Sequence, residues 1–130
     1  MAIRDHVIAI DFDGTVVTHE YPYMGEDNGA VSTLRELAAN GNRLLLLTMR
    51  SGSLLEEAKA WFASHDIPLW AVNENPEQGQ WTQSPKVYAN LYIDDANLGC
   101  PLKIVDSCSR PVADWGRIRQ QLIREGYLDE

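Results

Sequence analysis

A short apolar run, residues 7–10, ends in two aspartates that are separated by a single residue. The length of this run and its β-branched side chains predict a strand that is buried on both faces. Because side chains alternate along an extended chain, Asp11 and Asp13 point the same way and their charges repel each other. A bound divalent cation is the usual way in which a protein offsets such repulsion. The run therefore predicts a central strand with a charged site at its end.

Further apolar runs alternate with amphipathic segments along the 130-residue chain. Ser53 and Glu56 have the spacing of a capping box, which predicts the start of a helix, and Asp114 is expected to cap the last helix. The alternation predicts an α/β fold in three layers, with a central parallel sheet of about five strands and right-handed crossovers. The length predicts a single domain that spans residues 1–130. The expected strands are residues 7–10, 43–48, 68–72, 91–93 and 102–105, and the expected helices are residues 30–40, 53–65 and 115–125.

The overall composition narrows the classes of function. Hydrophobic residues make up 45% of the chain and charged residues 23%, as in soluble globular proteins. The net charge of −8 argues against binding to nucleic acid through phosphate neutralisation. No apolar run approaches the roughly 18 residues of a membrane span, and no signal peptide is recognised. Cys100 and Cys108 lack the spacing of a metal site and are expected to be reduced thiols, so we predict a cytoplasmic protein without a membrane partner.

Polar residues also follow two other predicted strands. Thr48 ends the second predicted strand, and Asp94 and Asp95 come directly after the fourth. In a parallel sheet the carboxyl ends of the strands meet at one edge, and ligands bind beyond that edge. We therefore expect these residues to share one crevice with Asp11 and Asp13, although they are far apart in the sequence.

The sequence Asp-Phe-Asp-Gly-Thr at residues 11–15 is followed in order by Thr48, by Lys86 and by the pair Asp94-Asp95. In these motifs, and over its whole length, the chain resembles the haloacid dehalogenase-like (HAD) phosphohydrolases. The resemblance implies a Rossmann-like fold. Response-regulator receivers combine similar residues, but their paired acids come on the first strand, whereas here the paired acids come last. The order of the motifs therefore favours the HAD-like fold over the receiver fold.

Most members of this superfamily carry an inserted cap domain that encloses small substrates. Only residues 16–28 and 73–85 occupy the two insertion points here, and neither segment is long enough to form a domain. The chain therefore looks like a small, capless bacterial or phage type, whose site is open unless these loops cover it. His19, Tyr21 and Tyr23 lie in the first loop and either cover the site or pack structurally.

The chemistry that the resemblance implies is a Mg²⁺-dependent hydrolysis of phosphomonoesters through an aspartyl phosphate. Asp11 would be the nucleophile, and Asp13 would protonate the leaving oxygen and later activate water. Thr48 would donate a hydrogen bond to a phosphoryl oxygen, and Lys86 would pair with both Asp11 and the phosphate. Gly14 would allow the backbone to turn tightly beside the phosphate.

The Mg²⁺ ligands that the resemblance implies are the carboxylates of Asp11 and Asp94 and the main-chain carbonyl of Asp13. Asp95 would hold one of the metal-bound waters, and the roles of Asp94 and Asp95 could be reversed. Arg50 either contacts the phosphate of the substrate or forms a plain salt bridge. The residues leave both interpretations of Arg50 open.

The expected substrate is a small phosphorylated metabolite, because the acidic chain disfavours a phosphorylated macromolecule such as a nucleic-acid end. A phosphatase that acts on macromolecules is the nearest alternative. The rival from another class is a non-hydrolysing phosphate-binding or regulatory protein with the same fold. The presence of all four motif elements favours catalysis, and the oligomeric state is left open.

Overall fold

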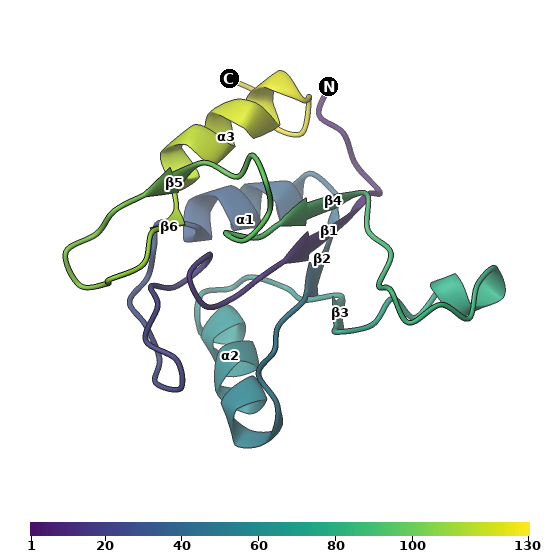
Figure 1. The fold of residues 1–130 in the computed structure, drawn as a ribbon. Helices are drawn as coiled ribbons and strands as arrows, with labels where there is room; N and C mark the ends of the chain where they lie inside the picture. The colour runs from purple at the N-terminus through teal and green to yellow at the C-terminus, as the bar shows by residue number, and fades with distance from the viewer.

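The structure is a computed structural model that describes residues 1–130. Its strands and helices, labelled in Figure 1, confirm the predicted α/β fold with a parallel sheet and flanking helices. None of the helices combines the length and the hydrophobicity that a membrane crossing requires. In chain order the elements are β1 (Val7–Ile10), α1 (Val31–Ala39), β2 (Arg43–Leu46), α2 (Gly52–Ser64), β3 (Ala71–Val72), the 3-10 turn η1 (Gln78–Gln80), β4 (Leu91–Ile93), β5 (Leu102–Lys103), β6 (Val112–Ala113) and α3 (Trp115–Arg124).

The central sheet has four parallel strands in the order β3-β2-β1-β4, so β1 lies between β2 and β4. Ile10, the last residue of β1, lies opposite Leu46 of β2 and Ile93 of β4, and the three strands therefore end level with one another. Asp11 extends this pairing, because its amide nitrogen donates to the carbonyl oxygen of Ile93 at 3.0 Å. The register brings the residues that follow β1 and β4 side by side at the carboxyl edge of the sheet.

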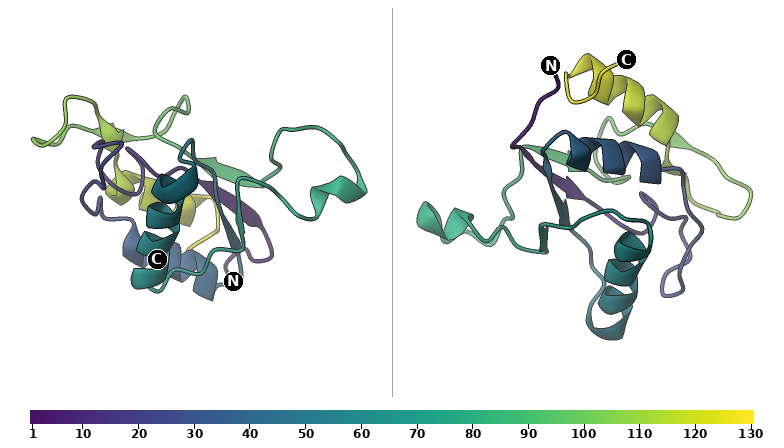
Figure 2. Two further views of the ribbon diagram at one scale, coloured as in Figure 1. Left: turned by 90° about the horizontal axis from the view of Figure 1, so that it is seen from below. Right: turned by 180° about the vertical axis from the view of Figure 1, so that it is seen from behind.

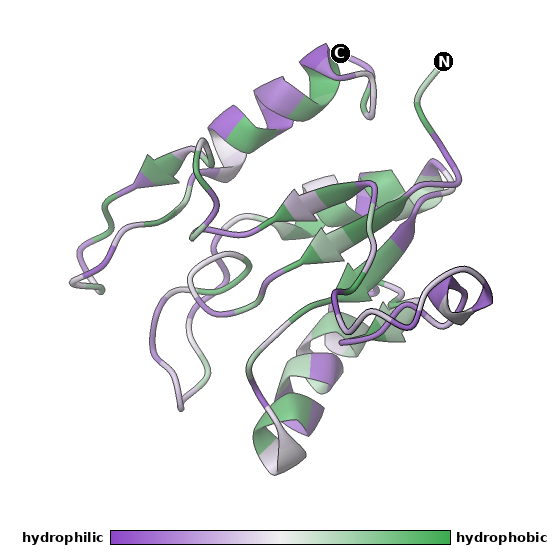
Figure 3. Ribbon diagram, turned by 45° about the vertical axis from the view of Figure 1, so that its right-hand side comes forward, coloured by the Kyte–Doolittle hydropathy of each residue, from purple (hydrophilic) through white to green (hydrophobic).

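One large hydrophobic core contains the buried faces of all three helices. Ile8 and Ile10 of β1 face this core, and Phe12 extends it beyond the strand. The ring of Phe12 meets Trp61 edge-on, with ring centroids 5.9 Å apart. Figure 3 shows the hydrophobic residues concentrated on the sheet and on one side of the helices. The buried helical members are Leu34 and Leu37 of α1, Ala58, Trp61 and Phe62 of α2, and Trp115, Ile118 and Leu122 of α3.

The other face of the sheet is covered without a helix. Val7, Ala9 and Leu45 are buried on this face and pack with Val87 and Ala89 from the connection between β3 and β4. The connection contains a single 3-10 turn, η1, and extends well away from the sheet in both views of Figure 2. Part of this connection, and no α-helix, therefore packs on this face of the sheet.

The fifth strand that the sequence predicts at residues 102–105 does not belong to the central sheet. Only its first two residues are extended, and they form β5, which pairs antiparallel with β6. The side chains of Leu102 and Ile104 are 41% and 84% exposed. A strand inside a parallel sheet is covered on both faces, and these two side chains are not. The sheet therefore has four strands, and no strand lies beside the outer edge of β4.

The boundaries of two helices test the predicted caps. α2 begins at Gly52, so Ser53 lies inside the helix and not at its cap position, and the expected capping box of Ser53 and Glu56 is wrong. The residue at the cap position is Ser51, and its side chain makes no capping hydrogen bond. The predicted cap of α3 is confirmed, because the side chain of Asp114 accepts a hydrogen bond from the amide nitrogen of the third helical residue. That bond satisfies one of the free amides at the start of the helix.

Candidate metal-binding site

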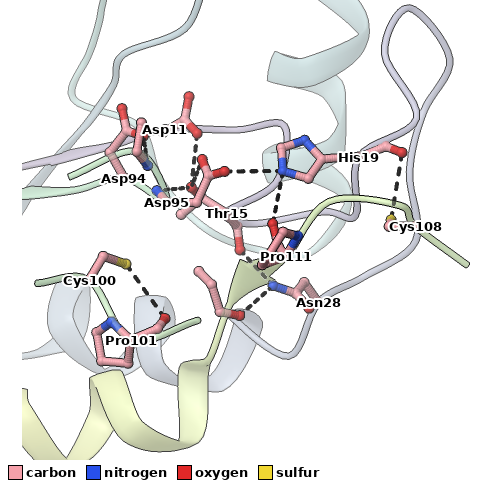
Figure 4. Close-up of polar contacts among 12 residues, drawn as sticks. Asp11, Thr15, His19, Asn28, Asp94, Asp95, Cys100, Pro101, Cys108 and Pro111 are labelled. Atoms are coloured by element: carbon pink, nitrogen blue, oxygen red, sulfur yellow. Dashed lines mark hydrogen bonds and ion pairs between the residues drawn. The ribbon is translucent and has the colours of Figure 1, made fainter. Parts of the chain in front are cut away.

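Three carboxylates meet at the carboxyl edge of the sheet (Figure 4). Asp11 follows β1, and Asp94 and Asp95 follow β4, so the parallel register of these two strands brings them together. Each residue offers one carboxylate oxygen such that all three oxygens lie within 4.8 Å of one another. Hard divalent cations such as Mg²⁺ prefer carboxylate and water oxygens, and this donor set fits that preference. The group can therefore hold a metal ion.

Burial and charge repulsion raise the pKa of Asp11 from 3.8 to about 8. The largest cause is the removal of the carboxyl group from water, followed by the negative charge of Asp94. Thr15 acts in the opposite direction, because its hydroxyl group donates to Asp11 Oδ2 at 2.8 Å. A cation bound among the carboxylates offsets such repulsion. The electrostatics of Asp11 therefore favour a cation at this position.

Hydrogen bonds occupy some of the oxygens in the cluster and leave others open. Thr15 Oγ1 accepts from the amide of Asp95 at 3.0 Å and lies 3.2 Å from Asp95 Oδ1. Asp94 Oδ1 accepts from the amide two residues further on, at 2.8 Å. Asp11 Oδ1, Asp94 Oδ2 and the main-chain carbonyl of Asp13 accept no hydrogen bond from the protein. These three oxygens are open to a ligand.

Asn28 and two residues near the other end of the chain hold the turn that follows β1. The carbonyl oxygen of Thr15 accepts from Trp115 Nε1 at 2.7 Å and from Asn28 Nδ2 at 3.0 Å. The carbonyl oxygen of Gly14 accepts from the amide of Ala113 at 2.9 Å. Sequence reasoning missed Asn28 and Trp115 as supporting residues, because no spacing in the sequence connects them with the aspartates. The tertiary fold alone brings them to this turn.

Asp13 lies outside the cluster, because Arg50 holds its side chain. Arg50 Nε donates to Asp13 Oδ2 at 2.9 Å, and a terminal nitrogen of Arg50 donates to Oδ1 at 2.7 Å, which is a bidentate ion pair. The hydrogen bonds to Asp13 raise the pKa of Arg50 above its ordinary value. The Arg50 side chain is 0% exposed and also donates to the carbonyl oxygen of Tyr23. The structure thus contains the salt bridge that one of the two interpretations of Arg50 expects.

Thr48 follows β2 at the same edge of the sheet, and Asn73 fixes its backbone. The amide nitrogen of Thr48 donates to Asn73 Oδ1 at 2.8 Å, and the Thr48 hydroxyl accepts from the amide of Arg50 at 3.1 Å. Asn73 has a φ of 55°, a left-handed conformation that asparagine adopts more readily than most residues. Sequence reasoning missed Asn73, although a polar residue directly after a strand was an available signal.

Lys86 lines the same cavity as Asp11 and Asp94 but forms no ion pair with them. A cavity of about 910 Å³ is lined by Lys86, Asp11 and Asp94, and it continues along the outer edge of β4 to α3. The Lys86 side chain is exposed and forms no salt bridge, so the predicted ion pair with Asp11 is not made. Leu98 and Cys100 also line the cavity, and the Cys100 thiol is free.

The loop that follows the aspartates places His19 in the site. Gly14 has a φ of 84°, and a Cβ atom at this position would lie 2.0 Å from the imidazole of His19. The glycine therefore provides the space that the imidazole occupies, as well as the left-handed turn. Tyr21 and Tyr23 of the same loop are 57% and 76% exposed. The Tyr21 ring lies against the guanidinium of Arg50, with 5.4 Å between Cζ and the ring centroid.

Comparison with known proteins gives one informative match. No protein-family model matches the chain, and no curated protein matches it. A solved structure, described as that of the conserved protein coded by locus from Bacteroides thetaiotaomicron, has 37% sequence identity to this chain. The match covers 92% of this chain and 91% of that chain, with a TM-score of 0.74. The likeness thus extends over most of both chains.

Proposed function

The chain belongs to the same family as the conserved Bacteroides thetaiotaomicron protein, and we propose that it is a Mg²⁺-dependent phosphatase of the HAD superfamily. It would hydrolyse phosphomonoesters through an aspartyl phosphate on Asp11. The observation that carries this proposal is the meeting of Asp11 with Asp94 and Asp95 at the ends of neighbouring strands. Thr48, which follows the strand on the other side of β1, supports it because phosphate ligands bind at this edge of such sheets.

Asp11 is suited to attack phosphorus. A carboxylate has two oxygens with two lone pairs each, so Asp11 can bind a cation through one oxygen and present the other to the substrate. The new bond between that oxygen and phosphorus forms as the ester bond between phosphorus and the leaving oxygen breaks. Water then attacks phosphorus as the bond between phosphorus and Asp11 breaks, so inorganic phosphate leaves and the carboxylate is restored. Asp13 would give a proton to the leaving oxygen in the first step and take one from the water in the second. Bound Mg²⁺ supplies positive charge against the phosphoryl oxygens and the carboxylates.

Thr48 and Lys86 are free to bind the phosphoryl group. The Thr48 hydroxyl accepts one hydrogen bond, and its own proton has no acceptor in the protein. Lys86 lines the same cavity as Asp11, and its ammonium group forms no salt bridge. Donors and cations held near the transferring phosphoryl group stabilise its charge. A cavity of about 910 Å³ has the size of small-molecule sites, which supports a small phosphorylated metabolite as substrate.

One observation favours a second candidate function. Asp13 has to exchange protons with the leaving oxygen and with water, yet both of its oxygens are engaged by Arg50. A protein that binds phosphate and Mg²⁺ without hydrolysis would need no such exchange. The second candidate is therefore a non-hydrolysing phosphate-binding protein with the same fold.

An assay with para-nitrophenyl phosphate tests the proposal directly. We expect turnover of the parent protein in Mg²⁺ and none in excess chelator, because the carboxylate cluster needs a cation. The variant Asp11→Asn should have no turnover, since the nucleophile is removed. The variant Asp66→Asn is the matched control, because Asp66 is an aspartate with an 88% exposed side chain after α2. Its turnover should equal that of the parent.

The phosphoenzyme provides an independent check. Acid-quenched parent protein should carry the added mass of one phosphoryl group on Asp11, and the linkage should be destroyed by base as expected for an acyl phosphate. Folded parent protein that binds Mg²⁺ but hydrolyses no ester in a panel of aryl, sugar and nucleoside phosphates would favour the non-hydrolysing candidate. Equal turnover by the parent and by Asp11→Asn would exclude the aspartyl phosphate.

A further inference from the structure

The imidazole of His19 connects the aspartate cluster with two other segments (Figure 4). His19 Nε2 lies 3.1 Å from Asp95 Oδ2 and 3.2 Å from the carbonyl oxygen of Pro111. The carbonyl oxygen of His19 also accepts a hydrogen bond from the thiol of Cys108 at 3.6 Å. The loop after β1, the end of β4 and the chain between β5 and β6 therefore meet at this one residue.

The partners of His19 fix which ring nitrogen carries a proton. Both neighbours of Nε2, the carboxylate of Asp95 and the carbonyl of Pro111, are acceptors, so Nε2 must carry the hydrogen that it donates to them. The side chains of His19 and Asp95 are only 14% and 10% exposed, so solvent offers little competition for this bond. Gly14 leaves the imidazole no room to move toward the backbone turn. The donor is therefore held in one orientation.

The hydrogen bond from His19 decides which oxygens of the cluster are open. Asp95 Oδ2 faces His19, and Asp95 Oδ1 lies against the hydroxyl of Thr15. Both oxygens of Asp95 are thus held by the protein, whereas Asp94 Oδ2 accepts no hydrogen bond. Hydrogen bonds to both oxygens fix the orientation of the carboxylate group. A cation or a water bound to it then meets an acceptor that is already oriented.

We propose that His19 is a positioning residue of the site: it holds Asp95 in the orientation in which the cluster takes a divalent cation, and so sets the affinity for that cation. This role rests on the metal dependence in the proposed function. It also gives Asp94 and Asp95 different tasks, because Asp94 keeps an open oxygen for direct contact and Asp95 does not.

Calorimetric titration of Mg²⁺ into the metal-free protein tests this role without any assay of turnover. Replacing the partner that orients a ligand group typically costs about 10- to 100-fold in metal affinity, and we expect a loss of this size in His19→Leu. The variant His19→Gln keeps an N–H donor near the position of Nε2 and should bind Mg²⁺ close to the parent. The variant His65→Leu is the control, because His65 stacks on Trp61 at the end of α2 and does not contact the cluster.

A double-mutant cycle separates action through Asp95 from general packing. If His19 acts through Asp95, His19→Leu should not weaken binding further in a protein that already carries Asp95→Asn. Thermal unfolding without metal shows whether each variant is folded. If His19→Leu does not fold, His19→Asn is used in its place. The asparagine side chain is shorter than that of histidine, so its amide group does not reach Asp95.

Two outcomes would overturn the role of His19. One is an affinity of His19→Leu equal to that of the parent, and the other is an equal loss in the presence and absence of Asp95→Asn. Both are measured on binding, so they are distinct from failure of the proposed function. A parent protein that binds Mg²⁺ with the expected dependence on His19 but hydrolyses no phosphate ester would retain this inference and lose the phosphatase.

Discussion

The two carboxylate oxygens of Asp13 lie 2.9 and 2.7 Å from nitrogens of Arg50, whose side chain has no surface exposed to solvent. Arg50 further donates to the carbonyl oxygen of Tyr23, and its Cζ atom lies 5.2 Å from the ring centroid of Phe12 and 5.4 Å from that of Tyr21. The charge of Arg50 is thus matched by Asp13 alone among its contacts. The pair joins the aspartate motif to the segment after β2 and to the loop after β1.

Replacing only one residue of this ion pair should lower the free energy of unfolding. Removing one partner of a buried ion pair typically costs about 3–5 kcal/mol, because the other charge stays buried without compensation. We expect a loss of unfolding free energy of this order in Arg50→Met. The double variant with Asp13→Asn should lose less than the sum of the two single variants, because it leaves no unmatched charge. Urea denaturation measures the free energy of unfolding of the two single variants and of the double variant.

The control for this cycle is a surface pair. Lys59 Nζ and Glu56 Oε2 lie 3.2 Å apart on α2, with side chains that are 43% and 69% exposed. Exposed pairs of this kind contribute about 0–1 kcal/mol, so Lys59→Met should change stability little. If the losses of unfolding free energy in Arg50→Met and Asp13→Asn simply add up in the double variant, the two side chains do not interact in solution.

The raised pKa of Asp11 predicts how the stability of the metal-free protein depends on pH. In the folded state this carboxyl group keeps its proton up to about pH 8, whereas in the unfolded chain it loses the proton near its ordinary value of 3.8. Between these values the folded state binds more protons, so the contribution of Asp11 to unfolding free energy falls as pH rises. The slope is at most about 1.4 kcal/mol per pH unit. Urea denaturation across this range should show a shallower decline in Asp11→Asn, and an unchanged decline would contradict the assignment.

Lys86 should matter for turnover and not for folding. The side chain is exposed and unpaired, so Lys86→Ala is expected to change unfolding free energy by no more than about 0.5 kcal/mol. Loss of a group that stabilises charge in the transition state typically lowers kcat by about 10²- to 10³-fold. Lys103→Ala is the matched control, since Lys103 is also exposed but lies in β5 and does not line the cavity. Loss of the folded circular-dichroism signal in Lys86→Ala would assign Lys86 a structural role.

A pair of glycine variants should separate the collision with His19 from backbone strain. Gly14 and Gly29 have φ values of 84° and 88°, so alanine at either position carries a left-handed cost of about 1–2 kcal/mol. A Cβ atom at Gly29 would meet nothing within 4 Å, whereas one at Gly14 would meet the imidazole. Gly14→Ala should therefore destabilise the protein more than Gly29→Ala, as measured by thermal unfolding. Adding His19→Ala should reduce the difference in destabilisation between Gly14→Ala and Gly29→Ala. A difference that persists would have a cause other than the collision with His19.

The local sequence predicts the elements that depend on burial. The apolar runs of β1, β2 and β4 correspond to strands of the central sheet, and the meeting of Asp11 with the Asp94 pair follows from their parallel register. The prediction fails at residues 102–105, where an apolar run that contains Lys103 pairs with β6 outside the sheet. The run is too exposed for a central strand, and apolar content alone does not reveal exposure.

Side-chain partners are harder to predict than elements. Arg50 could be read from the sequence as a phosphate ligand or as half of a salt bridge, and only the folded chain shows that it faces Asp13. His19 and Asn73 owe their positions to contacts with residues that are distant in the sequence or to a left-handed backbone. No periodicity encodes such contacts. The carboxylate cluster was therefore predictable, and the residues that support it were not.

The bond from the indole of Trp115 to the carbonyl oxygen of Thr15 spans 100 positions of the sequence. The signature aspartates are made first on the ribosome, yet the turn that carries them acquires this partner only when the last helix has been synthesised. A nascent chain that stops before α3 would thus display the whole amino-terminal motif without the geometry that it needs. The turn after β1 should therefore reach its folded geometry only after α3 has been synthesised.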